Sequence, residues 1–596
     1  MTPAVVFPII SSTRRLPGTI ACAATLLFST LLLPTTSTAQ GLSVVSASPA
    51  RQAISAPTNT SITITFDRAL DPATVTAAHV WAFARWSGTV SGPLTLSTNG
   101  EAITLTPSHP FSAGESVMVI VSEGLSALDG TDLTPGGFTT LFWTATALAT
   151  LDFTRIDEFT TRSTPTSSVR SYGGVGCDLN EDGHLDVAVI NEDSADLRVF
   201  LNLADGSGLF GPLVSPPSAI NLQASPNEPS DFDRDGHIDL VVCNIATDTI
   251  SVLLGNGDGS FQPQQQIAVG NGPRGVAVLD VDGDGDIDIV NTNFSDSNLS
   301  LLLNNGSGVF GPPTFFDGGG IGERSLAAAD FNEDGRLDLA CGSISGQTMT
   351  ILLSNGDGTF TLSDTEGGVG GTWMLALGDL NGDGHVDITS ANSSQNAGSV
   401  NFGNGDGTIS AVVSIPTDPF PIATDLGDID GDGDLDWITS SFSGDWFLFL
   451  NNGAGSFSFQ AEFLAPVASS CAVMMDIDTD GDLDLALIDE IVDVVILEQN
   501  GGSPPPTFVR GDSNLDGVFD IADPIGQLAI LFGGAPGPTC LDALDGNDDG
   551  VTDISDPIAA LTSLFTAAGP LPSPSLACGD DPTPDGLDCS ANPSCP

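Results

Sequence analysis

The stretch DVDGDGDID, residues 280–288, places five aspartates within nine positions. These carboxylates repel one another, and a helix or sheet face that carried them would be destabilised. A divalent cation cancels the repulsion if the chain turns so that alternate residues converge on it. Ca²⁺ takes about six to eight oxygen ligands, and a compact loop supplies them from its odd positions, with glycine at position 6 for the sharp turn. The stretch is therefore a candidate calcium-binding loop.

The motif occurs seven times along the chain. The copies are DLNEDGHLD (178–186), DFDRDGHID (231–239), DVDGDGDID (280–288), DFNEDGRLD (330–338), DLNGDGHVD (379–387), DIDGDGDLD (428–436) and DIDTDGDLD (476–484). Their starts are 48 to 53 residues apart, a period typical of a repeat architecture. Acidic hairpins without metal are the alternative, which the repetition of Asp or Asn at positions 1, 3 and 5 disfavours.

Each repeat has room for four strands. In one unit they are GVAVLDV, IDIVNTN, LSLLLNN and FGPPTFF, all within residues 275–316. A second motif, as in NGDGSF (256–261), keeps step with the first and is typical of a hairpin turn. Seven four-stranded units are what a seven-bladed β-propeller needs, so we predict this fold over residues 150–508. The segment that starts near Leu151–Phe153 is expected to supply the outer strand of the last blade.

The segments before the repeats have other patterns. Residues 1–39 place Arg14 and Arg15 before an apolar run, which predicts a secretory signal peptide, with a retained membrane anchor as the alternative. Residues 41–148 alternate apolar and polar positions in short runs such as SITITFDRAL, which predicts a β-sandwich. The chain is therefore expected to be mainly β and to act outside the cytoplasm.

Residues 509–569 contain two more acidic loops, offset by 33 residues. GDSNLDGVFDIAD (511–523) and DGNDDGVTDISD (545–556) carry an acid at position 12, which the seven repeats lack. Pro524 and Pro557 suit the first position of a helix. The residues that follow have apolar side chains at helical spacing: Ile525, Leu528, Ala529 and Phe532, then Ile558, Leu561 and Phe565. We predict a small double-loop domain with two helices.

We predict calcium ligands in all nine loops, with position 7 contributing its backbone carbonyl. In the repeats they are Asp178, Asn180, Asp182, His184, Asp186, Asp231, Asp233, Asp235, His237, Asp239, Asp280, Asp282, Asp284, Asp286, Asp288, Asp330, Asn332, Asp334, Arg336, Asp338, Asp379, Asn381, Asp383, His385, Asp387, Asp428, Asp430, Asp432, Asp434, Asp436, Asp476, Asp478, Asp480, Asp482 and Asp484. In the C-terminal loops they are Asp512, Asn514, Asp516, Val518, Asp520, Asp523, Asp545, Asn547, Asp549, Val551, Asp553 and Asp556.

The composition disfavours several classes of partner and of enzyme. The formal net charge is −62, and all 14 basic residues are arginine, so nucleic acid and anionic membranes are disfavoured as partners. No nucleophile, zinc-protease or phosphate-binding motif occurs, and no catalytic residue is predicted. Carboxylate pairs for glycoside hydrolysis, or a lyase on a propeller, stay open as alternatives.

The cysteines fall into two groups. In an exported chain, Cys540, Cys578, Cys589 and Cys595 predict two disulfides in the region that ends with the Cys/Pro-rich tail 570–596. Their pairing stays open, and a zinc site is the lesser alternative. Cys177, Cys243, Cys341 and Cys471 are expected to be buried as small apolar side chains.

The two repeat motifs together resemble the FG-GAP/VCBS repeats of integrin-like propellers. That resemblance implies that calcium rigidifies hairpins on one face, while ligands bind elsewhere, often on the opposite face or between blades. Residues 41–148 resemble the bacterial Ig-like domains of surface proteins, which usually act as spacers. The C-terminal loops resemble type I dockerins, which implies a cohesin-like partner at loop positions 10 and 11. Those positions hold Ile521–Ala522 and Ile554–Ser555 instead of Ser-Thr, so surface attachment or sorting is an equal alternative.

We therefore expect a secreted or cell-surface, calcium-binding protein whose propeller recognises an extracellular protein or glycan in adhesion, without catalysis. The alternative is a dockerin-bearing component of an extracellular assembly that binds or degrades polysaccharide.

Overall fold

The computed structural model describes residues 41–575, apart from residues 135, 165–166, 369, 443, 502–507, 516, 518, 535–536, 539, 542, 549–550, 567–568 and 573. The predicted signal peptide, residues 1–39, lies outside this range, as do Cys578, Cys589 and Cys595. Within the described residues no helix is long and apolar enough to cross a membrane. Strands dominate, which confirms the prediction of a mainly β chain.

The first described segment forms two four-stranded antiparallel sheets. One has the order β1 (Val44–Ser48), β2 (Ile62–Phe66), β6 (Ala102–Leu105), β5 (Leu94–Leu96), and the other the order β4 (Gly88–Thr89), β3 (Val80–Ala84), β7 (Ser116–Val121), β8 (Phe138–Trp143). The alternation in ITITF buries Ile62, Ile64 and Phe66 and leaves the residues between them half-buried. We call residues 41–148 the Ig-like domain.

The repeat region forms seven further four-stranded antiparallel sheets. Their first strands are β10 (Ser171–Cys177), β14 (Ala224–Ser230), β18 (Pro273–Leu279), β22 (Glu323–Ala329), β26 (Thr372–Gly378), β30 (Pro421–Gly427) and β34 (Ser469–Met475). Their second strands are β11 (Asp186–Asn191), β15 (Asp239–Asn244), β19 (Asp288–Asn293), β23 (Asp338–Ser343), β27 (Asp387–Asn392), β31 (Asp436–Ser441) and β35 (Asp484–Asp489). A 3₁₀ turn, η1 (Ile245–Thr247), follows β15.

The third and fourth strands complete each sheet. The third strands are β12 (Asp196–Phe200), β16 (Thr249–Leu253), β20 (Asn298–Leu302), β24 (Thr348–Ser354), β28 (Ala397–Asn401), β32 (Trp446–Leu450) and β36 (Val494–Gln499). The fourth are β13 (Ser218–Ala219), β17 (Gln265–Ala268), β21 (Thr314–Phe316), β25 (Phe360–Gly367), β29 (Val413–Pro416), β33 (Ser458–Phe463) and β9 (Thr154–Thr160). The four strands predicted for each repeat are therefore confirmed.

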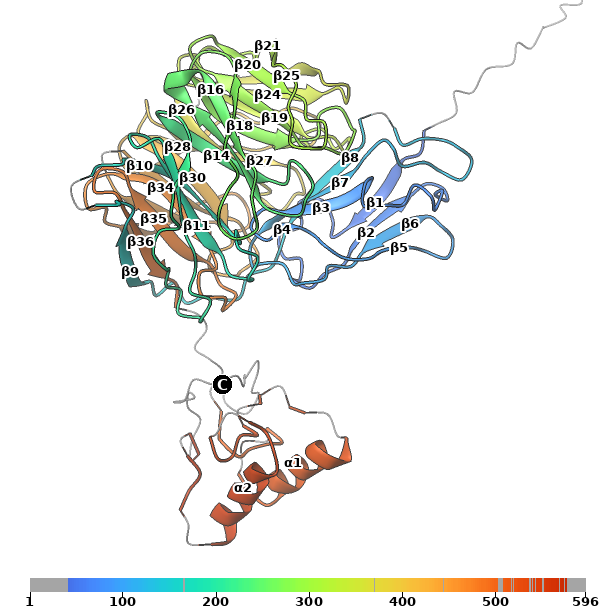
Figure 1. Cartoon of the computed structure of the whole chain (residues 1–596), viewed down its shortest axis with the longest axis vertical. Coiled ribbons are helices and arrows are strands. Elements are labelled where there is room, and N and C mark those ends of the chain that lie inside the picture. The colour runs from blue at the N-terminus through green and yellow to red at the C-terminus, as the bar shows by residue number, and fades with distance from the viewer. Residues whose placement is uncertain are drawn as a thin grey trace, which may run out of the picture. The chain divides into compact units, whose positions relative to one another are not determined.

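The last sheet takes its fourth strand from the start of the repeat region. β9 pairs antiparallel with β36, and Figure 1 shows this teal strand beside the orange strands β34–β36. The pairing begins at Thr154, a few residues after the predicted position. Each first strand lies beside the first strand of the next sheet, and β34 lies beside β10. The first and last sheets are thereby joined.

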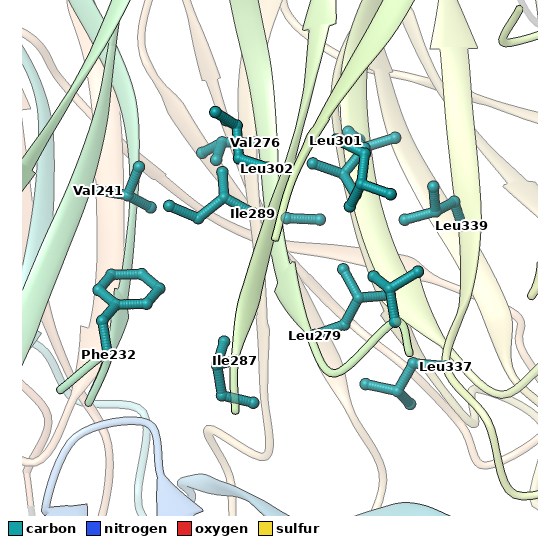
Figure 2. Packing of buried hydrophobic residues seen from close by; sticks show 14 of the residues in the cluster. Phe232, Val241, Val276, Leu279, Ile287, Ile289, Leu301, Leu302, Leu337 and Leu339 are labelled. Carbon is teal, nitrogen blue, oxygen red and sulfur yellow. The ribbon is translucent and has the colours of Figure 1, made fainter. Parts of the chain in front are cut away.

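Apolar side chains fill the space between neighbouring sheets. All six residues of every second strand are buried, because each is covered by strands of its own sheet and by the adjacent sheets. Figure 2 shows one such layer, in which Ile289 and Leu302 of one sheet lie near Val241 and Phe232 of the sheet before it. Burying a side chain of this size stabilises the fold by about 1.5–3 kcal/mol.

Asparagines also join neighbouring sheets. Asn304 Nδ2 donates to the buried carbonyls of Phe232, in the preceding repeat, at 2.8 Å and of Ile287 at 3.0 Å. Asn451 and Asn500 make the equivalent pair of bonds, one to the preceding repeat and one within their own. These bonds satisfy carbonyls that water does not reach.

The C-terminal segment forms two helices, α1 (Ala522–Gly533) and α2 (Ser555–Phe565), which pack against each other. Each begins two residues before its proline, so the proline lies inside the first turn and not at its first position. A missing N–H costs nothing there, because the first turn has no intrahelical acceptors.

The predicted apolar stripes of both helices largely face solvent. Phe532 is 72% exposed and Phe565 69% exposed. Asp523 and Asp556, at position 12 of the two loops, are fully buried instead. Cys540 is disulfide-bonded, as predicted, and the other three tail cysteines lie outside the described residues. Cys177, Cys243 and Cys341 are free and buried, also as predicted, whereas Cys471 is free and half-buried.

Replacing Asn304 with alanine tests the joints between sheets. Asn304→Ala leaves two buried carbonyls without these donors, and we expect a loss of about 2–3 kcal/mol in the free energy of unfolding of the repeat region, measured by denaturant titration. The exposed neighbour is the control, and Asn305→Ala should cost less than about 1 kcal/mol. Equal losses for both variants would contradict the inter-sheet role.

Candidate functional site

Each acidic loop connects the first strand of a sheet to the second. Position 9 is the first residue of the second strand, as Asp288 is of β19. Position 6 is a glycine with positive φ in every repeat, for example 92° at Gly285. Position 4 also has positive φ in every repeat; it is glycine in three loops, Gly283, Gly382 and Gly431, and a larger residue in four, Glu181, Arg234, Glu333 and Thr479. Two left-handed residues in a short span give the tight turn that the sequence predicts at position 6.

Backbone N–H groups hold the carboxylates at both ends of the loop. At position 1, Asp280 Oδ2 accepts from Gly285 N–H at 2.9 Å. At position 9, Asp288 Oδ2 accepts from Val281 N–H at 3.0 Å and Oδ1 from Asn304 N–H at 2.8 Å. The same bonds recur in all seven repeats. Position 9, in the second strand, therefore fixes the start of the loop and the turn that follows the third strand.

The loops bring positions 1, 3 and 9 together. In four loops, ligand oxygens of these three carboxylates all lie within 4.8 Å of one another: Asp231, Asp233, Asp239; Asp280, Asp282, Asp288; Asp428, Asp430, Asp436; and Asp476, Asp478, Asp484. The other three loops hold asparagine at position 3, namely Asn180, Asn332 and Asn381. Position 5 is placed differently, since its Oδ1 accepts the N–H of position 7, as Asp284 does from Asp286 at 2.9 Å.

The converging carboxylates are strongly destabilised as anions. Burial, together with the charges of nearby aspartates, raises the pKa of Asp288 to about 9 and that of Asp484 to about 9. Burial, helped by the charge of Asp284, raises the pKa of Asp280 to about 8. A cation among these oxygens would reverse this effect, because it favours the ionised form.

Orphaned oxygens support a metal at these loops. Asp282 Oδ1, Asp428 Oδ1 and Asp476 Oδ1 are buried without a hydrogen-bond partner among the described residues. Buried polar atoms normally have partners, and a metal ion is one explanation of such exceptions. The donor set is oxygen throughout, which suits a hard cation such as Ca²⁺. The residues present therefore fit calcium.

Neighbouring loops are linked by charged side chains that the sequence analysis did not identify. Position 4 of one loop reaches position 7 of the next: Glu181 to His237, Arg234 to Asp286 at 3.7 Å, and Glu333 to His385 at 2.6 Å. The signs are complementary in each pair when histidine is protonated. Comparing position 4 of each repeat with position 7 of the next would have revealed the pattern, since the sheets are consecutive.

The Ig-like domain packs against the acidic loops. Trp81 Nε1 donates to the carbonyl of Gly285 at 3.0 Å, and Thr89 Oγ1 donates to Asp231 Oδ2 at 2.6 Å. Backbone bonds join this domain, or the linker that follows it, to the loops at Asp178, Gly283, Gly335, Asp430 and Gly481. Trp81, Phe83, Met118 and Ile120 share one apolar core with strands of the repeats. The resemblance to spacer domains did not predict this contact.

A cavity of about 310 Å³ lies inside the ring of first strands. Side chains of the Ig-like domain, among them Phe83, Trp86 and Met118, line part of it. A second cavity of about 270 Å³ shares Tyr172, Arg274, Arg324 and Trp373 with the first. The Ig-like residues that line the first cavity are not among those of the second, which we call the mouth pocket.

The C-terminal loops repeat part of this geometry. Asp512 Oδ2 accepts from Gly517 N–H at 2.8 Å, as position 1 does in the repeats. At position 12, Asp523 accepts from Asp520 N–H at 2.8 Å and Asp556 from Asp553 N–H at 2.7 Å. Fully buried Arg510 links the two halves by donating to the carbonyl of Asp545 at 2.9 Å. The predicted ligands Asp516, Val518 and Asp549 lie outside the described residues.

Two sequence families match the chain. Residues 38–145 match the bacterial Ig-like domain, and residues 231–291, 280–341, 330–390, 379–439 and 428–487 match the FG-GAP-like repeat. The chain thus contains FG-GAP-like repeats and an Ig-like domain, which confirms both predictions. Repeats of this kind and the many four-stranded sheets are consistent with a propeller. No curated protein matches the chain.

Solved structures are similar only distantly. An Agrocybe aegerita lectin that recognises non-reducing terminal N-acetylglucosamine is 19% identical, over 56% of this chain and 87% of its own, with a TM-score of 0.38. Virginiamycin B lyase from Staphylococcus aureus, solved as an inactive variant with quinupristin, is 13% identical over 58% and 99%, with a TM-score of 0.40. A protein from Lactobacillus plantarum is 13% identical over 70% and 99%, with a TM-score of 0.39.

The raised pKa values predict how calcium should stabilise the chain. Without metal, a carboxyl whose folded pKa lies above its unfolded pKa stabilises the fold fully below about pH 4, and this contribution is lost as the pH rises through the folded pKa. The values of about 6 to 9 at positions 1 and 9 place that loss between about pH 5 and pH 9. Calcium binds the ionised form, so its stabilisation should grow over the same interval.

Thermal unfolding in calcium and in chelator, at pH 5, 7 and 9, measures this effect. We expect the Tm in chelator to fall with pH and the difference between the two conditions to exceed about 10 °C at pH 9. Magnesium at equal concentration is the control and should stabilise less, because it prefers a rigid octahedral site. A difference that stays constant from pH 5 to pH 9 would contradict metal binding at these carboxylates.

Proposed function

We propose that the chain is an exported, calcium-stabilised recognition protein, in which the seven sheets are the blades of a closed β-propeller. Calcium in the seven acidic loops holds the connections between the first and second strands, through the ligands predicted from the sequence. The converging buried carboxylates, some with oxygens that lack partners, support this part of the proposal. FG-GAP repeats and bacterial Ig-like domains are both typical of extracellular proteins, which supports export.

Recognition is assigned to the mouth pocket and not to the acidic loops. The observation that carries this assignment is that the Ig-like domain contacts the acidic loops and lines part of the first cavity, whereas it does not line the mouth pocket. Large aromatic side chains remain accessible at the mouth pocket, since Phe420 is 37% and Phe442 38% exposed. Accessible aromatic groups beside a cavity are typical of ligand sites. We propose no catalysis.

A second candidate function concerns the C-terminal domain. Its two helices and the residue before each expose apolar side chains at corresponding places, 33 residues apart: Ile521 and Ile554, Ile525 and Ile558, Phe532 and Phe565. A duplicated apolar surface fits a protein partner such as a cohesin-like module. In this case the chain would be one component of an extracellular assembly that binds or degrades polysaccharide.

Binding of the full mature chain to immobilised polysaccharides, in calcium and in chelator, tests the proposed function. We expect capture only in calcium. The double variant Phe420→Ala with Phe442→Ala should weaken capture at least about tenfold, whereas Ile525→Ser with Ile558→Ser should leave it unchanged. The two double variants are matched, because each removes two exposed apolar side chains. Loss of capture only in the helix variant would overturn the assignment and favour the second candidate.

A further inference from the structure

The mouth pocket is built from equivalent positions of the repeats. Tyr172, Arg274, Arg324 and Trp373 are each the second residue of a first strand, in β10, β18, β22 and β26. Glu192 and Phe442 each follow the second strand of their sheet. Because these positions recur in every repeat, their side chains gather at one end of the first strands. The chemical character of the pocket is therefore set by the residue that each repeat has at these positions.

Three residues that line the pocket have a left-handed backbone conformation although they are not glycine. The residue just before the first strand is glycine with positive φ in two sheets, Gly272 at 68° and Gly322 at 66°. The three residues that line the mouth pocket from this position have the same left-handed backbone with large side chains: Arg170 at 56°, Gln223 at 54° and Phe420 at 61°. Such conformations cost about 1 kcal/mol or more for a residue other than glycine, and they are concentrated at functional sites.

Two arginines in the pocket form no ion pair with a carboxylate of the described residues. Among the described residues, the ion pairs at the pocket join Arg170 to Glu192 at 3.3 Å and to Glu490 at 3.4 Å, and none includes Arg274 or Arg324. Arg324 is only 7% exposed, and Arg274 Nε is buried with no hydrogen-bond partner in the described part of the chain. This is unexpected in a chain with 76 acidic residues and 14 basic ones.

Burial destabilises the charged form of both guanidinium groups. It lowers the pKa of Arg324 to about 9, and it also lowers the pKa of Arg274. Glu192 acts on both groups electrostatically but forms no ion pair with either among the described residues, so a ligand carboxylate would be their direct partner. Arginine binds a carboxylate through two parallel hydrogen bonds, which makes this group the simplest counter-charge.

Aromatic side chains complete the pocket. Arg324 lies over the ring of Trp373, 3.4 Å from its centroid, and Trp373 Nε1 donates to Tyr172 Oη at 3.1 Å. Phe420 contacts both Trp373 and Phe442, with ring centroids 5.4 and 5.9 Å apart. These contacts hold the arginine and form an accessible apolar wall beside it. The pocket thus offers cations, an apolar wall and the polar groups of Gln223 and Glu192.

We propose that the mouth pocket binds an acidic sugar, a hexuronate at the end of or within a polysaccharide. Its carboxylate pairs with Arg274 and Arg324, the C–H face of its ring packs on Phe420 and Phe442, and its hydroxyls bond to Gln223 and Glu192. A simple carboxylate would supply the first contact and not the other two. This inference rests on the proposed function and adds the ligand class to it.

Calorimetric titration of the calcium-loaded mature chain tests the ligand class. The probes are galacturonate and glucuronate trimers, the matching neutral galactose and glucose trimers, and N-acetylaspartate, in about 0.15 M salt so that the net negative charge is screened. We expect a uronate trimer to bind at least about tenfold more tightly than its neutral counterpart and than N-acetylaspartate. Neutral trimers that bind as tightly as uronates, or N-acetylaspartate that does so, would overturn the proposal.

Variants locate the site. Arg274→Gln with Arg324→Gln should weaken uronate binding at least about tenfold while leaving the calcium-dependent rise in Tm intact, because neither side chain forms an ion pair with a described residue that the substitution would break. Arg155→Gln, on the outer strand β9, is the control and should bind normally. Unchanged binding in the double variant would overturn the proposal.

If no uronate binds but a neutral polysaccharide is captured through Phe420 and Phe442, the ligand class is wrong and the proposed recognition function stands. If no probe binds, both fail.

Discussion

The fold depends on carboxylates that are buried next to one another. At position 9 of each repeat, one aspartate accepts two backbone N–H bonds and so fixes the acidic loop, its own second strand and the hairpin that follows. The aspartates at positions 1 and 3 approach the same point. These side chains cannot all be ionised at neutral pH without a counter-charge, as the raised pKa of Asp288 shows. A cation bound in the loop would supply the counter-charge where the repulsion arises.

This constraint extends through the molecule because of where the loops lie. They end the first strands, and the first strands surround the central cavity. The Ig-like domain bonds directly to loop atoms, such as Asp231 Oδ2 and the carbonyl of Gly285. Loss of metal would therefore disturb the domain contact as well as the individual sheets. The mouth pocket lies at the other end of the same strands, where Arg274 and Arg324 are the second residues of β18 and β22. Loop geometry and pocket geometry thus share one set of strands.

Much of the fold and of the acidic loops could be predicted from the sequence, and the features that were not predicted share physical causes. The steady spacing of the acidic motif, with its Gly at position 6, predicted the repeats and four strands in each. Contacts between units could not be predicted in this way: neither the bond from Trp81 to Gly285 nor the pair Glu333–His385 follows from the pattern within one repeat. Helical spacing located α1 and α2 correctly, but spacing alone does not say whether an apolar stripe is buried, and Phe532 is exposed. Arg274 and Arg324 were missed because their significance lies in the absence of an ion pair among the described residues, which depends on the folded arrangement.

An anomalous-scattering map from crystals of the calcium-loaded chain tests metal binding most directly. We expect a calcium peak inside each of the seven repeat loops, about 2.3–2.6 Å from carboxylate oxygens at positions 1 and 3 and from the position-7 carbonyl. Well-ordered loops without such peaks, at millimolar calcium, would contradict metal binding at these loops.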